Sequence, residues 1–219
     1  VMTALMLRLA GPTQAWDSRR RLSDYDGRRG SYAGPADLMP TYSGVVGMLA
    51  AALGLPRDSD QSRLGGLDII VRVDQPGRQR GEFRTSRRLA PDGKVKVFGV
   101  IEQMLDDAAF LVGIGAPEAV LDEIEAALRR PAYPLFLGKR ECPITLPLIL
   151  GRSDLPVVDA VRSWPSIASE WARDERHVPA VFGSPDPVVL RLRRTPRLPE
   201  PSIAARRWSA RSDDDPEVL

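Results

Sequence analysis

Histidine and cysteine are almost absent from this 219-residue chain, which contains one of each. A structural zinc site or a histidine-based metal centre needs several such ligands, so neither is expected. The single cysteine, Cys142, cannot form an internal disulfide. The sequence therefore predicts a protein that works with no metal and no cofactor.

Long apolar runs are absent too, since no segment approaches the roughly 20 apolar residues that a membrane helix needs. The first apolar run, residues 4–10, is interrupted by Arg8 and lacks the small-residue cleavage site of a signal peptide. A hydrophobic content of 43% still allows a substantial core, in one large domain or two small ones. We expect a cytoplasmic protein with no membrane partner.

The net charge of +2 is small, but the charges are segregated along the chain. Residues 72–96 hold eight basic side chains against three acids, whereas residues 97–128 hold seven acids and no Lys or Arg. Arginines also cluster at 19–21, at 28–29 and in 191–211. Any one run is ordinarily solvated surface, but several in a nearly neutral chain favour a partner with a phosphate backbone.

Residues 40–55, PTYSGVVGMLAAALGL, raise the question of a glycine-rich phosphate loop. A Walker-type loop needs Lys and Ser/Thr after its last glycine, but Met48 and Leu49 follow Gly47. The glycine spacing is not that of a dinucleotide-binding fingerprint either. The segment is therefore not expected to be a nucleotide loop.

A buried helix explains the same residues better. Thr41 or Ser43 supplies an N-cap, and Gly54 followed by Pro56 supplies the stop. Helical spacing gives an apolar face and a stripe of small residues: Val45, Leu49 and Ala52, and Gly44, Gly47 and Ala51. The polar end around Tyr42 could still bind an anion through free amides.

Alternating apolar residues predict strands over residues 3–10 and 67–74, each half-buried, with Arg8 and Arg72 on the faces away from the core. Residues 108–114 predict a third strand. A second helix is expected to begin at Pro117, with an apolar face formed by Val120, Ile124 and Ala127. Residues 133–150 predict two strands joined by a turn containing glycine.

Residues 75–98 have no core pattern and abundant Gly and Arg, so they predict an extended arm or hairpin. The resulting order is βαββαβ, which indicates an α+β, ferredoxin-like core over residues 1–150. Residues 151–219 form a C-terminal extension in this interpretation. It contains a short helix and late strands near 188–193 and 203–209.

Three long motifs occur together and in order: LRLAGPTQAW at 7–16, the 40–55 segment, and FLGKRECPITLPLILG at 136–151. They resemble the CasD subunits of type I-E Cascade, the CRISPR surveillance complex, which belong to the RAMP superfamily. PRLPEPSIAARRW at 196–208 is similar to the C-terminal strand of that family.

The resemblance implies a ferredoxin-like, RRM-related fold with a protruding thumb at about 75–98. It implies a non-catalytic antiviral subunit that binds crRNA, caps its 5′ handle, and contacts the backbone subunit and the large subunit of Cascade. Target DNA would be met only indirectly. The family's glycine-rich loop would be residues 137–140, where glycine permits close backbone approach and the basic residues meet phosphates.

Candidate RNA-binding residues combine positive charge, stacking surface and the two motif loops. Trp16 and Trp208 are equally ordinary core candidates. Residues 96–99, KVFG, are only a fragment of the usual aromatic RNA motif, so stacking on the sheet centre is not expected. The candidates are Arg8, Trp16, Arg19, Arg20, Arg21, Thr41, Tyr42, Ser43, Gly44, Arg72, Arg84, Gly138, Lys139 and Arg140.

The alternative function is a metal-independent endoribonuclease that processes CRISPR precursor RNA, as related subunits of another subtype do. Such cleavage needs a general base and an acid. The single histidine, His177, lies in a charged stretch far from the motifs, and Tyr42 with Lys139 is the other conceivable pair. We expect no catalysis. A generic RNA-binding module outside CRISPR would require all the motif matches to be accidental.

Overall fold

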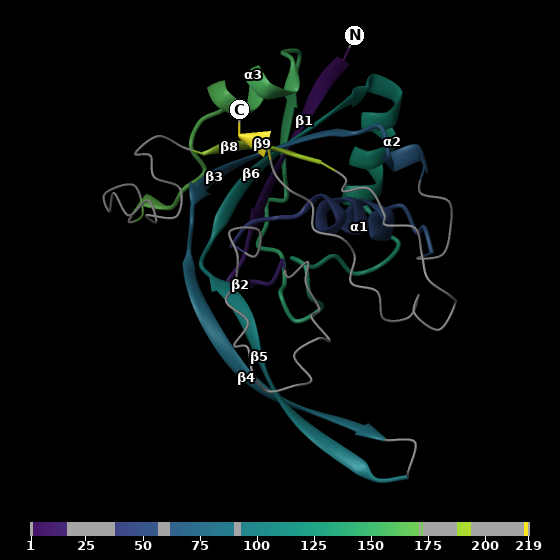
Figure 1. Cartoon of the computed structure of the whole chain (residues 1–219). Coiled ribbons are helices and arrows are strands. Elements are labelled where there is room, and N and C mark those ends of the chain that lie inside the picture. The colour runs from purple at the N-terminus through teal and green to yellow at the C-terminus, as the bar shows by residue number, and fades with distance from the viewer. Residues whose placement is uncertain are drawn as a thin grey trace.

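A computed structural model gives the structure of residues 2–16, 38–56, 62–89, 93–170, 172, 188–193 and 217–218. Six strands of this part of the chain form an antiparallel sheet (Figure 1). Across the sheet they lie in the order β7 (Ile149–Ser153), β1 (Met2–Ala10), β6 (Ala109–Pro117), β3 (Asp68–Gln75), β8 (Val189–Leu192) and β9 (Glu217–Val218).

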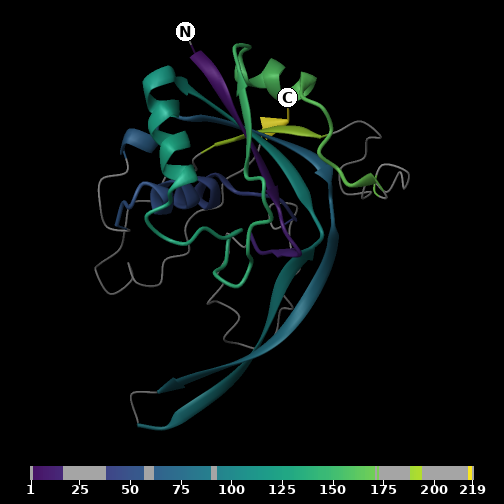
Figure 2. The same ribbon diagram turned by 180° about the vertical axis from the view of Figure 1, so that it is seen from behind.

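The chain has the predicted α+β class and the predicted βαββαβ order. Helix α1 (Tyr42–Ala52) lies between β1 and β3 in the sequence, and helix α2 (Glu118–Arg129) lies between β6 and β7. Both helices cover the same face of the sheet (Figure 2). Alternate residues of the strands meet them there in the larger core, for example Leu5, Leu7, Ile69 and Val71.

Helix α1 begins as the sequence predicted. The Thr41 hydroxyl accepts a hydrogen bond from the backbone N–H of Gly44 at 3.1 Å and caps the helix. The expected core face, Val45, Leu49 and Ala52, is buried. Gly54, with φ +72°, follows the last turn.

Helix α2 starts directly after Pro117 and is amphipathic. The predicted apolar face is rotated by about one residue, because Val120 and Ala127 are only partly buried. The fully packed positions are Leu121, Ile124 and Leu128. This i, i+3, i+7 set places a larger side chain against the sheet than the predicted set does.

An ion-pair cluster joins α2 to the edge strand β7. Arg152 donates to Glu125 Oε2 and to Asp122 Oδ1, each at 2.8 Å, and Arg129 donates to Glu125 Oε1 at 2.7 Å. The hydrogen bond from Arg129, followed by that from Arg152, lowers the pKa of Glu125. The helix is thus fastened to the sheet edge by charge as well as by packing.

The second face of the sheet is also covered, so the prediction of half-buried strands is wrong. Helix α3 (Val157–Ser163) packs on this face, opposite α1 and α2. Gly113 makes room for it, since a Cβ there would lie 2.5 Å from Val161 Cγ2. As a result, Ala4, Met6 and Ile70, which the alternation places on the open face, are buried beneath α3 together with Leu111.

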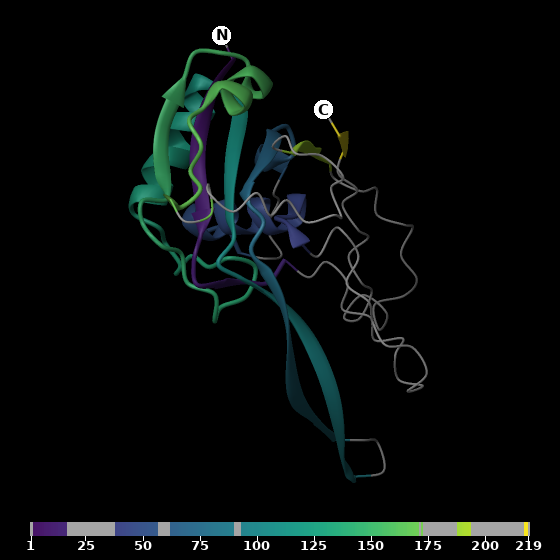
Figure 3. The same cartoon turned by 90° about the vertical axis from the view of Figure 1, so that its left-hand side faces the viewer.

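The arm is a long β-hairpin formed by β4 (Arg78–Leu89) and β5 (Val95–Asp106). Its register runs from Arg78 opposite Asp106 to Leu89 opposite Val95. The short strand β2 (Thr13–Gln14) pairs with the root of β5. Figure 3 shows the hairpin projecting well beyond the body. The arm is confirmed, but it ends at Asp106 rather than near residue 98.

Residues 133–150 do not form the predicted strand–turn–strand unit. They are mostly irregular, with one isolated bridge between Phe136 and Pro143, and the strand β7 starts only at Ile149. Prolines at 134, 143 and 147 lack the N–H that a strand ladder requires. The late strand near 188–193 is confirmed as β8, whereas residues 203–209 lie outside the described ranges.

Within the described ranges, none of the helices is both long and apolar enough to cross a membrane.

Candidate nucleic-acid interface

The glycine-containing loop predicted at 137–140 folds back on the segment that follows β1. Leu137 N–H donates to the Cys142 carbonyl at 2.8 Å, and Ala15 N–H donates to the Leu137 carbonyl at 3.1 Å. Gly138 has φ +83°, and a Cβ at this position would lie 1.9 Å from the carbonyl oxygen of Ala15. A backbone does approach this glycine closely, but it is the protein's own.

Trp16 is a core residue. It is 2% exposed, and its indole N–H donates to Gln14 Oε1 at 2.8 Å. The ring lies against the first turn of α1, because a Cβ on Gly44 would be 2.9 Å from Trp16 Cε3. In this structure Trp16 is therefore packed in the core, as the core alternative predicts, and its ring is not exposed for stacking.

Thr41 and Tyr42, at the N-terminus of α1, are buried, and the structure itself uses their hydroxyls. Thr41 caps the helix, and the Tyr42 hydroxyl donates to the Leu64 carbonyl at 3.3 Å in the 3-10 turn η3 (Ser62–Leu64). Ser43 and Gly44 remain partly exposed. Of the four predicted RNA-binding residues at this helix start, only Ser43 and Gly44 are accessible to solvent and so to a ligand.

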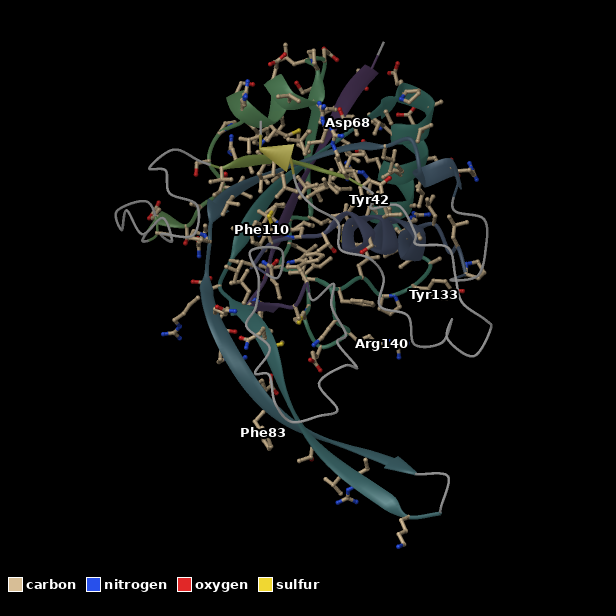
Figure 4. All side chains as sticks on the ribbon, in the orientation of Figure 1. Tyr42, Asp68, Phe83, Phe110, Tyr133 and Arg140 are labelled. Atoms are coloured by element: carbon tan, nitrogen blue, oxygen red, sulfur yellow. The ribbon has the colours of Figure 1, made fainter. Side chains whose placement is uncertain are left out.

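The two basic residues of the loop differ in accessibility. Arg140 is exposed and lies at the lower edge of the body, on the side from which the arm leaves it (Figure 4). Lys139 is partly buried, and its ammonium nitrogen is shielded from solvent. Arg140 is thus the more accessible of the pair to a phosphate.

Arg8 lies beside the segment that follows this loop. It is partly buried, and its Nη1 donates to the carbonyl of Thr145 at 3.3 Å. Backbone hydrogen bonds hold the chain close here, from Arg8 N–H to the Leu148 carbonyl at 2.7 Å and from Thr145 N–H to the Ala10 carbonyl at 2.8 Å. The structure thus places Arg8 against the segment 145–148, whereas the α1 N-terminus and the 137–142 loop meet through Ala15 and Trp16.

Arg72 was predicted on an open strand face, and this prediction is wrong. The residue is 4% exposed and forms a bidentate pair with Asp74 at 2.6 and 2.8 Å. Its guanidinium also donates to backbone carbonyls at and after the end of α3, those of Val161, Trp164 and Pro165. The burial of α3 against the sheet removes Arg72 from the surface.

The arm carries Arg84 in β4 and has two chemically different faces. Because opposite residues of an antiparallel pair share a face, the register places Phe83, Val95 and Val97 on one face. All three are exposed, with fractions of 69%, 61% and 59%. Phe83 points into the open beside the arm in Figure 4.

The other face of the arm carries charges that pair with one another near the root. Arg80 Nε donates to Asp106 Oδ2 at 2.7 Å, and Arg80 Nη1 lies 3.6 Å from Glu82 Oε2. The hydrogen bond from Arg80 lowers the pKa of Asp106. Arg80 is therefore partly neutralised within the arm, whereas Arg87, on the apolar face, is exposed.

Four predicted positions lie outside the described residues: Arg19, Arg20 and Arg21 after Trp16, and His177. Among the residues that the structure does describe, no group of three or more His, Cys, Asp or Glu side chains could hold a metal ion.

Sequence reasoning missed two buried glutamines at the root of the arm, Gln14 and Gln75, which are 0% and 4% exposed. Gln14 Nε2 donates to the Ala108 carbonyl at 2.8 Å, and Gln75 Nε2 donates to the Asp107 carbonyl at 2.6 Å. The only sequence signal was position, since Gln75 directly precedes the Pro76–Gly77 pair from which the arm begins.

An antiparallel βαββαβ sheet with two helices on one face, a long hairpin arm and a glycine loop beside its root defines a RAMP-type protein. The comparisons with known proteins agree. Residues 4–211 match the family described as CRISPR-associated protein (Cas_Cas5), and the chain belongs to this family.

Individual relatives support the assignment. The chain is 33% identical over 174 residues to the CRISPR system Cascade subunit CasD of Escherichia coli (strain K12), covering 67% of this chain and 70% of that protein. A structure described as the crystal structure of a Cas protein aligns at 31% identity and a TM-score of 0.59, covering 99% and 94% of the two chains. A chain of a CRISPR RNA-guided surveillance complex aligns at 29% identity and a TM-score of 0.54, covering 67% and 61%.

Proposed function

We propose that this protein is a non-catalytic crRNA-binding subunit of a type I-E Cascade complex. In this role it caps the 5′ handle of the guide RNA and helps to assemble the surveillance complex. Membership of the Cas5 family and the similarity to CasD of Escherichia coli support the proposal. Its partners are the guide RNA, the backbone subunit and the large subunit, and it meets target DNA only indirectly.

The exposed arm is the observation that carries the proposal. A two-stranded hairpin is marginally stable by itself in water. This one exposes Phe83, Val95 and Val97 on one face, and no described residue of the chain covers them. Apolar side chains gathered on a projecting element are typical of a surface that a partner buries. The arm therefore fits a subunit that is completed by its complex.

The loop beside the root of the arm supplies an RNA-facing surface. Arg140 is exposed there, and the partly exposed Ser43 and Gly44 are joined to the loop through Ala15 and Trp16, while Arg8 contacts the following segment at Thr145. A guanidinium donates to phosphate oxygens in a fixed fork, and backbone N–H groups at a helix start favour anions. In this proposal Gly138 shapes the loop, and Arg19–Arg21 and Arg84 add further positive charge.

Co-purification tests the function directly. Expressed with the other Cascade subunits, the chain is expected to bring down a guide RNA whose 5′ end is protected from exonuclease. A complex that assembles with an equally protected 5′ end when this chain is omitted would contradict the capping role.

Salt dependence tests the loop. Binding of single-stranded 5′-handle RNA should weaken with salt by roughly 0.7 log units per phosphate contact for each tenfold increase. The double variant Lys139→Ala/Arg140→Ala should show a smaller slope. Arg130→Ala, an exposed arginine at the end of α2, is the matched control and should leave the slope unchanged. A slope unchanged in the double variant would make the loop an ordinary solvated turn.

The nuclease alternative receives no support from the described geometry, because the Tyr42 hydroxyl already donates to the Leu64 carbonyl. Purified protein incubated with repeat RNA in the absence of metal is expected to leave the RNA intact. Specific cleavage that disappears in Tyr42→Phe or His177→Ala would establish the endoribonuclease instead.

A further inference from the structure

We infer that Gln14 and Gln75 are positioning residues. Their hydrogen bonds form a clamp at the root of the arm, where β4 and β5 join the body, and fix the direction of the arm relative to the RNA-facing loop (residues 137–142). The arm joins the body through two short connections, Pro76–Gly77 before β4 and Asp107–Ala108 after β5. Without contacts at its root, a long hairpin on two such connections would be free to change its direction relative to the sheet. Both glutamines hydrogen-bond the second of these connections, one from β2 and one from the end of β3.

The clamp acts on two consecutive carbonyls. Gln75 Nε2 donates to the Asp107 carbonyl at 2.6 Å, and Gln14 Nε2 donates to the Ala108 carbonyl at 2.8 Å. The backbone N–H of Asp107 donates in turn to the Pro12 carbonyl at 3.1 Å. Asp107 has φ +55°, a left-handed conformation that Asp adopts more readily than most non-glycine residues but that still needs supporting contacts. These hydrogen bonds are such contacts.

The amide oxygen of each glutamine accepts hydrogen bonds from a different part of the body. Gln14 Oε1 accepts from the Trp16 indole at 2.8 Å. Gln75 Oε1 accepts from both the backbone N–H and the hydroxyl of Ser169, at 3.1 and 2.6 Å. Because a buried amide left without partners is unfavourable, both side chains are locked in a single orientation.

The residues that follow Gln14 contact the RNA-facing loop directly. Trp16 packs on Gly44 in the first turn of α1, and the carbonyl of Ala15 fills the space where a side chain on Gly138 would lie. The segment 14–16 therefore contacts the arm root, the helix start and the loop at once. Rotation of the arm about the Asp107–Ala108 connection would therefore disturb the contact between Gln14 and Ala108.

The Gln75 side leads to the segment after α3. Asp74, the residue before Gln75, accepts from the Ile167 N–H at 2.7 Å and pairs with Arg72. Segment 164–169 is thus fastened to the end of β3, where the arm begins. The arm root is held between this segment and segment 14–16. The clamp itself does not depend on the function proposed above. The further step, that the fixed direction sets where the arm meets its partners, rests on that function.

Spin-label distances in the free protein test the clamp without any RNA. Labels on Thr85→Cys in the arm and Glu118→Cys at the start of α2 both occupy exposed sites, and the native Cys142 is fully buried. The unaltered protein is expected to give one narrow distance distribution. Gln14→Met and Gln75→Met keep the side-chain length but lose every hydrogen bond of the amide, so each should broaden the distribution. Gln79→Met, an exposed glutamine on the arm, is the control and should not.

Hydrogen exchange separates positioning from general destabilisation. In both methionine variants, exchange in peptides covering residues 104–108 should be about tenfold faster, as expected for the loss of one buried hydrogen bond, while peptides in the centre of β6 stay protected. Gln75→Glu keeps the acceptor for Ser169 but, when ionised, loses the donor to Asp107, so it should reproduce the effect even if a methionine variant fails to fold. Unchanged distances, or exchange that rises equally throughout the sheet, would overturn the inference. Loss of RNA binding with an intact clamp would count against the proposed function alone.

Discussion

Gly138→Ala offers a sharp test of why the 137–142 loop contains a glycine. The added Cβ would lie 1.9 Å from the Ala15 carbonyl oxygen, whereas ordinary van der Waals contact begins near 3.4 Å. The carbonyl would have to withdraw by the difference, about 1.5 Å. This displacement would break the hydrogen bond between Ala15 N–H and the Leu137 carbonyl.

The magnitude follows from three contributions. Alanine at a positive φ costs about 1 kcal/mol relative to glycine. Loss of the backbone hydrogen bond costs about 1 kcal/mol, and forcing an atom into a packed region costs about 1–3 kcal/mol. We expect Gly138→Ala to lower the free energy of unfolding by about 3–5 kcal/mol.

The matched control is Gly93→Ala at the tip of the arm. Gly93 has φ +77°, close to that of Gly138, but nothing lies within 4 Å of the position that an added Cβ would take. Because the arm contributes little to the stability of the body, Gly93→Ala should cost at most the conformational term of about 1 kcal/mol, and the larger loss expected in Gly138→Ala reports the clash. Urea unfolding followed by tryptophan fluorescence measures both, since Trp16 is buried beside the loop.

Equal losses in the two variants would refute the reasoning, because the Ala15 contact would then contribute nothing. A Gly138→Ala variant that is fully stable but binds 5′-handle RNA poorly would show that the glycine serves RNA approach instead.

Arg72→Met is expected to lower the free energy of unfolding in urea by about 3–5 kcal/mol, because it leaves the buried Asp74 carboxylate without its ion-pair partner. Adding Asp74→Asn should recover part of the loss, and purely additive losses in the double variant would contradict the pairing. Replacing residues 80–104 by an Asn-Gly turn should leave the thermal midpoint of the body nearly unchanged but prevent incorporation into Cascade, and a normal yield of complex would contradict the role of the arm. Trypsin should cut at exposed arginines of the arm such as Arg78 and Arg87 more slowly in the complex than in the isolated protein, and equal rates would mean that the arm contacts no partner. Folding lowers the pKa values of Asp106 and Glu125, so their stabilising contribution is present above about pH 4 and is lost as the pH falls through the folded values. The urea midpoint should therefore drop between about pH 5 and pH 3, and a midpoint that does not change with pH would argue against both ion pairs.

Local patterns predicted much of the fold. The cap of α1, the alternation in β1 and β3, and the βαββαβ order follow from spacing and capping chemistry, which act within a few residues. The arm was recognised by its lack of a core pattern. Its second strand was not, because residues 97–106 carry acids and apolar residues that blend into the following strand β6.

The errors arose where distant segments meet. Whether Arg8 or Arg72 is exposed depends on what covers the second sheet face, and the α3 residue that Arg72 contacts, Val161, lies 89 residues further along the chain. The burial of Trp16 likewise depends on α1 and on a glutamine two residues earlier. Period-2 alternation states which residues share a face but not whether another element lies on it. Charge alone therefore did not indicate which of the arginines are exposed.

The two connections at the root of the arm have a consequence for how such an arm changes length. In an antiparallel hairpin, two residues inserted into each strand preserve the pairing of Arg78 with Asp106 and keep Phe83 on its face, while extending the reach by about 6.8 Å. A single inserted residue would instead exchange the apolar and charged faces beyond it. Among relatives that share this root, arm lengths should therefore differ in steps of four residues, with bulges where they do not. We therefore expect that the hairpin of one family member can be replaced by that of another at residues 78 and 106, which would fit the same body to complexes of different span.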